Sequence, residues 1–212
     1  MSKTGIKLVV GLGNPGPEHE RDRHNVGFWF ADALSGHAGA SFKVEKKFFS
    51  ETARGTLGGR PLLLQKPNTY MNRSGQAVQS VVSYLKIPLS DILIVHDDLD
   101  LPPGTARIKR GGGHGGHNGL RDVIHHLGRD FMRLRLGIGH PGRPEDVTDY
   151  VLKRPSGDEK RLIDDALADA LAVVPQLLEG DFEDAMLKLH SRGVTPKPYR
   201  KKQKSDSTED KA

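Results

Sequence analysis

Residues 92–95 read Ile-Leu-Ile-Val, and the polar segment His96-Asp-Asp-Leu-Asp-Leu-Pro-Pro-Gly104 follows them directly. A short, continuously apolar run of this kind is typical of a strand that is buried on both faces of a sheet. Three other apolar runs, at 6–12, 61–65 and 134–138, predict further strands. The four runs together indicate a sheet in the core of the protein.

Helical patterns lie between and after the predicted strands. Apolar residues recur at helical spacing within 72–86 and again within 162–174. Ser156 and Glu159, directly after Pro155, have the spacing of a capping box that would start the second of these helices. Strands that alternate with helices predict an α/β fold.

The segments 47–57 and 104–109 are candidates for antiparallel strands, so that a mixed sheet is expected. We therefore predict a single α/β domain over residues 1–190, with a mixed, mostly parallel twisted sheet and helices on both faces. Residues 191–212 contain seven Lys/Arg and three Asp/Glu and little apolar surface. They are expected to form a basic, mobile C-terminal tail, because such a composition does not offset the entropy of ordering.

Composition excludes several classes of site. The chain contains no cysteine, which removes disulfides, thiolate zinc sites and cysteine nucleophiles. No stretch is long and apolar enough to predict a membrane span, and a cytoplasmic location is expected. Of the net charge of +5, the tail supplies +4, which leaves +1 for the first 190 residues. Segment 105–143 is nevertheless basic, which fits either a nucleic-acid substrate or an ordinary solvated surface.

Two polar clusters follow predicted strands. Asn14 and His24 lie in the segment after the first strand, and Asp97 lies after the buried run 92–95. If these strands are neighbours, the three side chains converge on one crevice at the carboxyl edge of the sheet. A carboxylate beside an imidazole fixes its tautomer and makes it a better base. The alternative for Asp97 is a loop cap or a turn former.

Nucleophile and cofactor options are few. No serine occupies a G-x-S-x-G motif, so that water activated by histidine is the expected nucleophile. Gly11, Gly13 and Gly16 match G-x-G-x-x-G, but prolines and charges delay the helix to about His24, which argues against a dinucleotide site. A metal held by His96, Asp97, His114 and His117 is a further alternative, although no standard ligand spacing is present. We predict no metal and no cofactor.

Two more polar segments are candidates for substrate binding. The glycine-rich run Gly111-Gly-Gly-His-Gly-Gly-His-Asn-Gly119 leads into a helical pattern, at whose start His117 and Asn118 would meet a ligand. The alternative is a flexible connector in which Asn118 is only an N-cap. Asn72 follows the strand at 61–65 and could bind an amide or act as another N-cap. Its neighbours Tyr70 and Met71 would be substrate contacts or core residues.

These motifs together resemble the bacterial-type peptidyl-tRNA hydrolase family. The resemblance rests on Val-Gly-Leu-Gly-Asn-Pro-Gly (10–16), Arg-His-Asn-Val-Gly (23–27), Lys-Pro-Asn-Thr-Tyr-Met-Asn-Arg-Ser-Gly (66–75), the segments 96–104 and 111–120, and Arg-Leu-Arg-Leu-Gly-Ile-Gly-His-Pro (133–141). It covers roughly residues 6–190. It implies hydrolysis of the ester that joins a peptide to the 3′ ribose of tRNA, which recycles tRNA from abandoned translation.

The resemblance also implies roles for individual residues. His24 matches the base that activates water, Asp97 the carboxylate that orients it, and Asn14 the amide that distinguishes a peptidyl from an aminoacyl end. The implied substrate contacts are Tyr70, Met71, Asn72, His117 and Asn118, together with Lys109 and Arg135, which match a pair of cations that holds the tRNA 5′ phosphate.

This sequence departs from the family at His19, where a tyrosine that contacts the tRNA end is usual. Imidazole can still stack and hydrogen-bond, so that His19 is kept as a substrate contact. The connection at 128–131 is also short for the family. The expected partner is peptidyl-tRNA, with no DNA and no membrane, and the expected state is a monomer. The competing interpretation is a non-enzymatic RNA-binding relative, against which the presence of His24, Asp97 and Asn14 argues.

Overall fold

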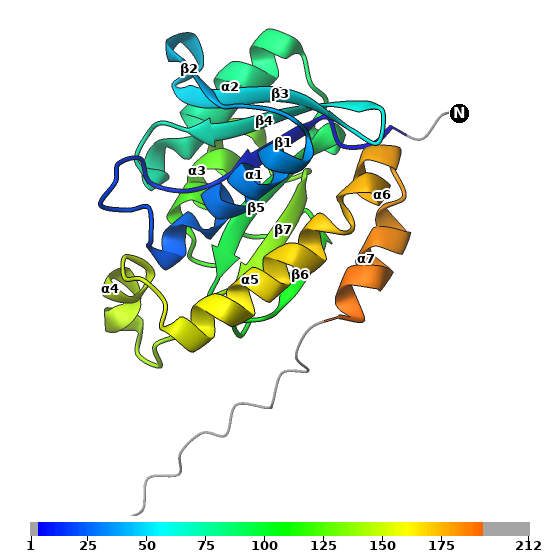
Figure 1. Cartoon of the computed structure of the whole chain (residues 1–212). Coiled ribbons are helices and arrows are strands. Elements are labelled where there is room, and N and C mark those ends of the chain that lie inside the picture. The colour runs from blue at the N-terminus through cyan, green and yellow to red at the C-terminus, as the bar shows by residue number, and fades with distance from the viewer. Residues whose placement is uncertain (1–3, 193–212) are drawn as a thin grey trace, which may run out of the picture.

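A computed structural model of the chain describes residues 4–192 (Figure 1). Its single sheet has the strand order β2-β3-β4-β1-β5-β7-β6. The strand bounds are β1 Leu8–Gly11, β2 Lys43–Glu45, β3 Ser50–Leu57, β4 Arg60–Pro67, β5 Ile92–Asp98, β6 Ala106–Arg110 and β7 Met132–Gly137. Strands β4, β1, β5 and β7 are mutually parallel, whereas β3 and β6 run against their neighbours. The predicted mixed, mostly parallel sheet is confirmed, including antiparallel strands near 47–57 and 104–109.

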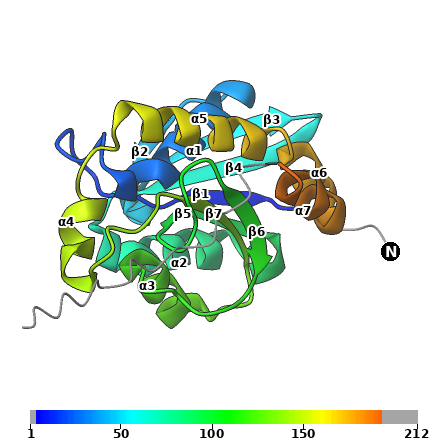
Figure 2. The ribbon, with the colours of Figure 1, turned by 90° about the horizontal axis from the view of Figure 1, so that it is seen from below.

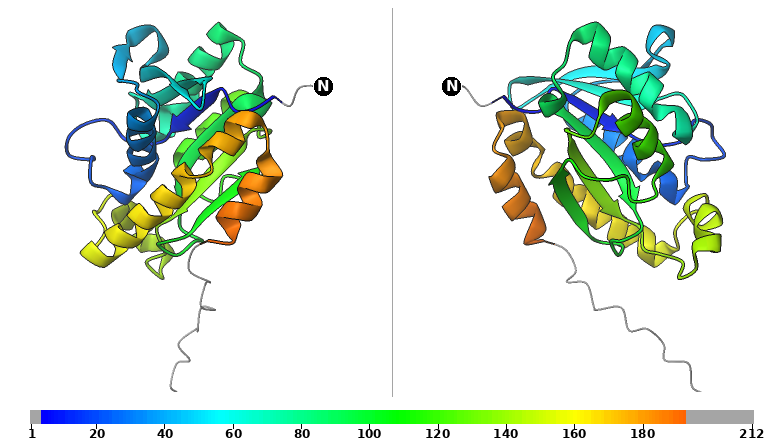
Figure 3. Two further views of the ribbon diagram at one scale, coloured as in Figure 1. Left: turned by 45° about the vertical axis from the view of Figure 1, so that its right-hand side comes forward. Right: turned by 180° about the vertical axis from the view of Figure 1, so that it is seen from behind.

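Helices cover both faces of this sheet, as predicted (Figure 2). Their bounds are α1 Val26–His37, α2 Ser74–Leu85, α3 Asn118–Leu127, α4 Val147–Val151, α5 Gly157–Leu171, α6 Val174–Glu179 and α7 Phe182–His190. Residues of α1, α5, α6 and α7 share one apolar core with the sheet, and residues of α2 and α3 share another on the opposite face. In the left view of Figure 3, α5 lies in front of the sheet. In the right view, from behind, α2 and α3 lie in front of it.

The central strands alternate between the two cores. In β5, Leu93 and Val95 belong to the core under α1 and α5, whereas Ile92 and Ile94 belong to the core under α2 and α3. All four are 0% exposed, which confirms a strand buried on both faces. Each such side chain contributes about 1.5–3 kcal/mol relative to exposure. The neighbouring β1 places Val9 in the first core and Leu8 and Val10 in the second.

Strand β5 is longer than the sequence indicated. The polar residues after Val95 were expected in a loop, but the ladder with β7 continues to the pair Asp98↔Gly137. The strand was predicted to end with the apolar residues at Val95, whereas backbone hydrogen bonds to β7 continue to Asp98. As a result, Asp97 is held by a strand in the middle of the sheet.

The later helix was predicted as one continuous run over 162–174, and this was wrong. Helix α5 ends at Leu171 and α6 begins at Val174, with Pro175 in its first turn. Proline tolerates a helix start but removes a backbone donor from a helix interior. The predicted capping box is present, since Ser156 N donates to Glu159 and Glu159 N donates to the Ser156 hydroxyl at 3.3 Å.

The last helix, α7, ends at His190. Of the tail predicted at 191–212, residues 193–212 lie outside the described part of the chain. Within 4–192, no helix is long and apolar enough to cross a membrane.

Candidate active site

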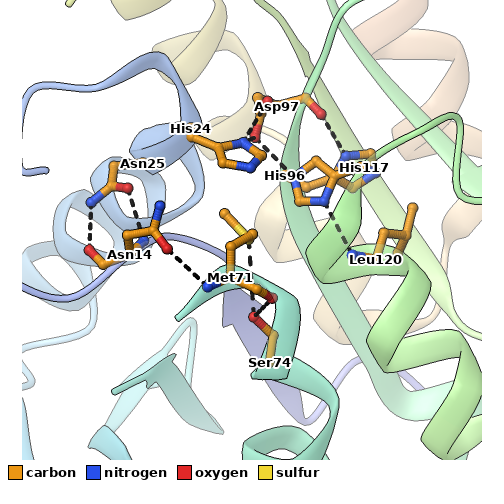
Figure 4. Close-up of polar contacts among 9 residues, drawn as sticks. All are labelled: Asn14, His24, Asn25, Met71, Ser74, His96, Asp97, His117 and Leu120. Atoms are coloured by element: carbon orange, nitrogen blue, oxygen red, sulfur yellow. Dashed lines mark hydrogen bonds and ion pairs between the residues drawn. The ribbon is translucent and has the colours of Figure 1, made fainter. Parts of the chain in front are cut away.

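Three segments meet at the carboxyl edge of the sheet: the stretch after β1, the end of β5 and the start of α3 (Figure 4). His24 lies in a short 3-10 helix, η1 (Arg23–Asn25), that leads into α1. A Cβ on Gly27 would lie 2.5 Å from backbone atoms of Leu12 and from the carbonyl of Val95, and a Cβ on Gly11 would lie 2.2 Å from the carbonyl of Gly27. These glycines therefore allow the start of α1 to pack directly on β1 and β5, which brings His24 to Asp97.

The G-x-G-x-x-G pattern consequently has a packing explanation. Gly11 contacts Gly27, and a Cβ on Gly13 would lie 2.7 Å from the ring of Phe28. Helix α1 begins only at Val26, after η1, as the sequence predicted. No helix N-terminus follows these glycines closely enough to bind a pyrophosphate between them.

His24 and Asp97 are in direct contact. The Nδ1 atom of His24 lies 2.9 Å from Oδ1 and 3.0 Å from Oδ2 of Asp97. Burial lowers the pKa of His24, but the Asp97 carboxylate outweighs it and the net pKa is raised above 6.5. Burial also opposes the charge on Asp97, yet His24 and His117 hold the pKa of this carboxyl well below its usual range. Asp97 is therefore ionised, and it orients His24 with Nε2 directed away from the carboxylate.

His117 is a second histidine on the same carboxylate. Its Nε2 lies 2.9 Å from Oδ1 of Asp97, and its Nδ1 accepts the backbone N–H of Leu120 at 3.1 Å. Because Nδ1 accepts, the proton of a neutral ring resides on Nε2 and is donated to Asp97. His117 is also the N-cap of α3, so that the two roles fix its ring in place.

A third histidine, His96, contacts both Asp97 and His117. Its Nδ1 is 2.7 Å from the carbonyl oxygen of Asp97, and its ring lies edge-on to that of His117. Burial and the neighbouring His117 lower the pKa of His96 to about 4. It is therefore neutral at physiological pH and donates to the backbone of Asp97.

His24, Asp97 and His117 are the one group within 4–192 whose histidine and carboxylate atoms are close enough to share a metal ion. The tautomer of His117 opposes that use, because Nε2 carries the proton and has no lone pair for a metal. His114 was also among the metal ligands considered from the sequence. Its Nδ1 accepts from Gly116 N at 3.1 Å, and it is not part of this group.

A cavity of about 380 Å³ opens beside this cluster. Eight of the eleven residues predicted for the site line it: Asn14, His24, Tyr70, Met71, Asn72, Asp97, His117 and Asn118. Tyr70 is 67% exposed, whereas Met71 is 4% exposed and lies beneath Gly119, so that Met71 is also a core residue. His19, Lys109 and Arg135 do not line the cavity.

Asn14 is held rigidly with one amide group free. Its Oδ1 accepts from Met71 N at 2.8 Å, and its backbone N–H and carbonyl both bond the Asn25 side chain at 2.9 Å. Its Nδ2 atom has no hydrogen-bond partner among residues 4–192, and Figure 4 draws its Oδ1 bonded to Met71 N. A buried amide with an unused donor at a cavity wall can bind a carbonyl group.

The N-cap alternative is wrong for both of the other asparagines. His117 caps α3 in place of Asn118, and Asn72 lies inside the 3-10 helix η3 (Met71–Arg73) that precedes α2. Both side chains are exposed at the cavity.

The predicted cations lie on β6 and β7. In the antiparallel ladder, Lys109 lies directly across from Arg133, and Arg107 lies across from Arg135. These four side chains therefore share one face of the two strands. Arg135 Nε donates to Oδ2 of Asp98 at 2.7 Å, next to the cluster. His19, by contrast, contacts Asp22 at 2.8 Å.

The sequence did not indicate the part of the cavity wall that α4 forms. Val147, Thr148, Val151 and Leu152, in and after α4, line the cavity there, and Asp98 and Leu99 line it at the end of β5. Helix α4 has five residues, too few for helical periodicity to be recognised. The buried Arg23 connects this wall to η1, because its guanidinium donates to the carbonyls of Tyr150 and Lys153 at 3.2 and 3.0 Å.

Comparison with known proteins gives a consistent result. The family model described as peptidyl-tRNA hydrolase matches residues 8–197. A peptidyl-tRNA hydrolase of Neisseria meningitidis is 55% identical over 193 residues, which are 91% of this chain and 100% of that protein. One from Polynucleobacter necessarius is 52% identical over 88% of this chain and 99% of its own length. The crystal structure of the Acinetobacter baumannii peptidyl-tRNA hydrolase has a TM-score of 0.88 at 46% identity, and the match covers 91% of this chain and 97% of that one.

Proposed function

The chain belongs to the peptidyl-tRNA hydrolase family, and on this basis we propose that it hydrolyses the ester between peptide and tRNA with His24 as general base. The contact between His24 and Asp97 is the observation that carries this proposal. Peptidyl-tRNA hydrolases of 52–55% identity match most of the chain, which makes the chain an enzyme of this class.

In the proposed mechanism, His24 Nε2 removes a proton from a water molecule that attacks the ester carbonyl. Asp97 holds Nδ1–H and stabilises the imidazolium that forms. His24 then returns the proton to the departing 3′ oxygen of the ribose. Amide donors of Asn72 and Asn118 lie at the same cavity and support the developing oxyanion, each worth about 3 kcal/mol.

Asn14 supplies the selectivity for a peptidyl ester. Its free Nδ2 donor faces the cavity and can bind the carbonyl of the peptide bond that precedes the esterified residue. A free aminoacyl ester lacks this carbonyl and carries an ammonium group in its place. Loss of a hydrogen bond to a buried polar group discriminates strongly between such substrates.

The RNA side of the site is proposed to lie over β6 and β7. Lys109 and Arg135 would hold a terminal phosphate, and contacts of this kind position RNA without reading its sequence. Tyr70, which is largely exposed at the cavity, and His19 are proposed to contact the acceptor end. Residues 1–190 would form the catalytic domain and the basic segment 191–212 an accessory tail. We further propose that the enzyme acts as a monomer in the cytoplasm, where translation supplies the substrate, and needs neither a cofactor nor DNA.

The direct test is deacylation of N-acetyl-aminoacyl-tRNA and of the same aminoacyl-tRNA without the acetyl group, both in excess chelator. The expected result is rapid cleavage of the blocked ester alone. Tight tRNA binding without cleavage would replace the hydrolase by an RNA-binding function. Activity that disappears in chelator would overturn the metal-free base.

A further inference from the structure

A second cavity, of about 490 Å³, lies beside the first at the carboxyl edge of the sheet. It is lined by the segment after β1, by the start of β3, by the end of β4 and by the first half of α1. Asn14 lines both cavities, so that its side chain forms the boundary between them. The amide nitrogen of this 7% exposed residue has no partner within 4–192, and a ligand that passes from one cavity to the other would meet it.

The second cavity carries a net negative charge. Its titratable lining residues are Glu20, Asp32, Glu51 and Lys66. Lys66 is already engaged, because its ammonium lies 2.7 Å from Asp32 and 3.2 Å from Glu51. One cation among three carboxylates leaves two negative charges, and the Glu20 carboxylate forms no ion pair with another residue of 4–192.

The walls between these charges are partly apolar. Phe28 and Trp29 of α1 and the prolines Pro15, Pro17 and Pro67 contribute apolar surface, whereas Asn14, Asn25 and Asn68 contribute amide groups. An aliphatic stem can lie along such surfaces while a charged head reaches the carboxylates, as lysine and arginine side chains do. Glu20 and Trp29 also line a further hollow together with Arg21, Arg154 and Lys160, and the Lys160 ammonium lies 5.1 Å from the centre of the Trp29 ring, so that the negative region ends at Glu20 and Trp29.

The second cavity lies on the side of the active site that faces away from the proposed RNA-binding strands. In the strand order, β4 lies on one side of β1 and β5, and the pair β7–β6 that carries Arg135 and Lys109 lies on the other. RNA bound over β6 and β7 would leave the side toward β4 for the other half of the substrate. The ester at His24 would then lie between them.

We propose that the second cavity binds the residue that precedes the esterified one, and that its carboxylates favour an ammonium or guanidinium group there. The proposal rests on the hydrolase activity proposed above. The peptide leaves the catalytic cavity past Asn14, whose Nδ2 bonds the intervening peptide carbonyl. The side chain of the preceding residue enters between Glu20 and Glu51.

The size of the effect follows from the exposure of the carboxylates. The Asp32 and Glu51 side chains are 52% and 38% exposed, so that solvent screens them. Pairs of this kind are worth about 0.2–1 kcal/mol each, so that two of them, with Glu20 and Glu51, correspond to a preference of about two- to thirtyfold for a basic over a neutral residue.

The test uses three substrates on one tRNA: N-acetyl-Lys-Ala-tRNA, N-acetyl-Ala-Ala-tRNA and N-acetyl-Glu-Ala-tRNA. Initial rates below saturation give kcat/KM for wild type, for the double variant Glu20→Gln/Glu51→Gln, and for Glu179→Gln. Glu179 is an exposed glutamate at the end of α6 and serves as the control for loss of charge. A fourth substrate, Ala-Ala-tRNA with a free amine, shows whether a terminal ammonium is accepted in place of the lysine side chain.

The expected order for wild type and Glu179→Gln is Lys above Ala above Glu, and the double variant should cleave all three at rates within about twofold. Equal rates for the three substrates in wild type would overturn the subsite while leaving the hydrolase intact. Absence of cleavage of N-acetyl-Ala-Ala-tRNA would overturn the hydrolase itself. An unchanged preference in the double variant would place the selectivity outside this cavity and also overturn the proposal.

Discussion

His117 Nε2 lies 2.9 Å from the same oxygen of Asp97 that receives His24 Nδ1 at 2.9 Å. The rings of the two histidines are 4.8 Å apart, so that Asp97 is held between them. Leu120 N–H occupies the other nitrogen of His117, which leaves Nε2 as the donor. The carboxylate that orients His24 is therefore itself oriented by the start of α3.

Replacing His117 by alanine should lower kcat by about tenfold, the lower end of what loss of a supporting hydrogen bond costs. It should also lower the free energy of unfolding by about 1 kcal/mol, because α3 loses its N-cap. Steady-state kinetics and urea denaturation measure the two effects. His125→Ala, which changes an exposed histidine of α3 outside the cavity, is the control, and equal kcat values for the two variants would contradict the role of His117.

The pH dependence should report the interaction of His24 with Asp97. The neutral form of His24 is the base, and its pKa is raised, so that kcat/KM of wild type should rise with pH through a midpoint above 6.5. In Asp97→Asn the attraction is lost while burial still lowers the pKa, so that the midpoint should move to lower pH. The plateau rate should fall by about 10³-fold, because the imidazole is no longer held in the required tautomer. A midpoint that stays in place would show that Asp97 does not control this titration.

If Lys109 and Arg135 bind an RNA phosphate, their loss should weaken substrate binding and its salt dependence. Lys109→Gln and Arg135→Gln should each raise KM with little change in kcat. Each should also reduce the dependence of log KM on log salt concentration by about 0.7–0.9, as expected for one lost phosphate contact. Arg60→Gln, an exposed cation on the distant β4, is the control. Salt dependence that equals that of wild type in both the Lys109 and the Arg135 variant would argue for another RNA path.

Arg23 should contribute strongly to stability. Its guanidinium donates to two carbonyls of the α4 region, contacts Glu159 at 2.8 Å and stacks 4.0 Å from the Tyr150 ring centre. Arg23→Met should lower the free energy of unfolding by about 3 kcal/mol, because buried carbonyls lose their donors. Arg21→Met, an exposed change in the same segment, should cost less than about 0.5 kcal/mol in the same urea titration. Similar losses for the two variants would count against the anchoring role of Arg23.

The strands and the main helices could be predicted from the sequence because their apolar residues follow simple periods. Ile92 to Val95 gave the central strand, and the Ser156–Glu159 pair gave the start of α5. The polar end of β5 was missed because neither His96 nor Asp97 resembles a strand residue. Their burial depends on partners that are distant in sequence, such as His24, 73 residues away from Asp97.

Only part of the site could be predicted, because several of its contacts also join residues that are far apart in the sequence. Residues in motifs, such as Asn14 and His24, could be selected before their neighbours in space were known. Local pattern gave no signal for Val151 or for the anchoring contacts of Arg23, because α4 is short and those contacts join residues 127 and 130 positions apart. Nor could pattern assign the N-cap of α3 to His117, since asparagine is the more usual capping residue.

The most direct test of His24 as general base is the single-turnover rate of N-acetyl-aminoacyl-tRNA cleavage by His24→Ala, with enzyme in excess and tRNA affinity measured in parallel. The expected rate is about 10²–10⁴-fold below wild type with affinity nearly unchanged, because general-base catalysis is lost while the binding groups remain. Cleavage at the wild-type rate by His24→Ala would contradict the central role of His24.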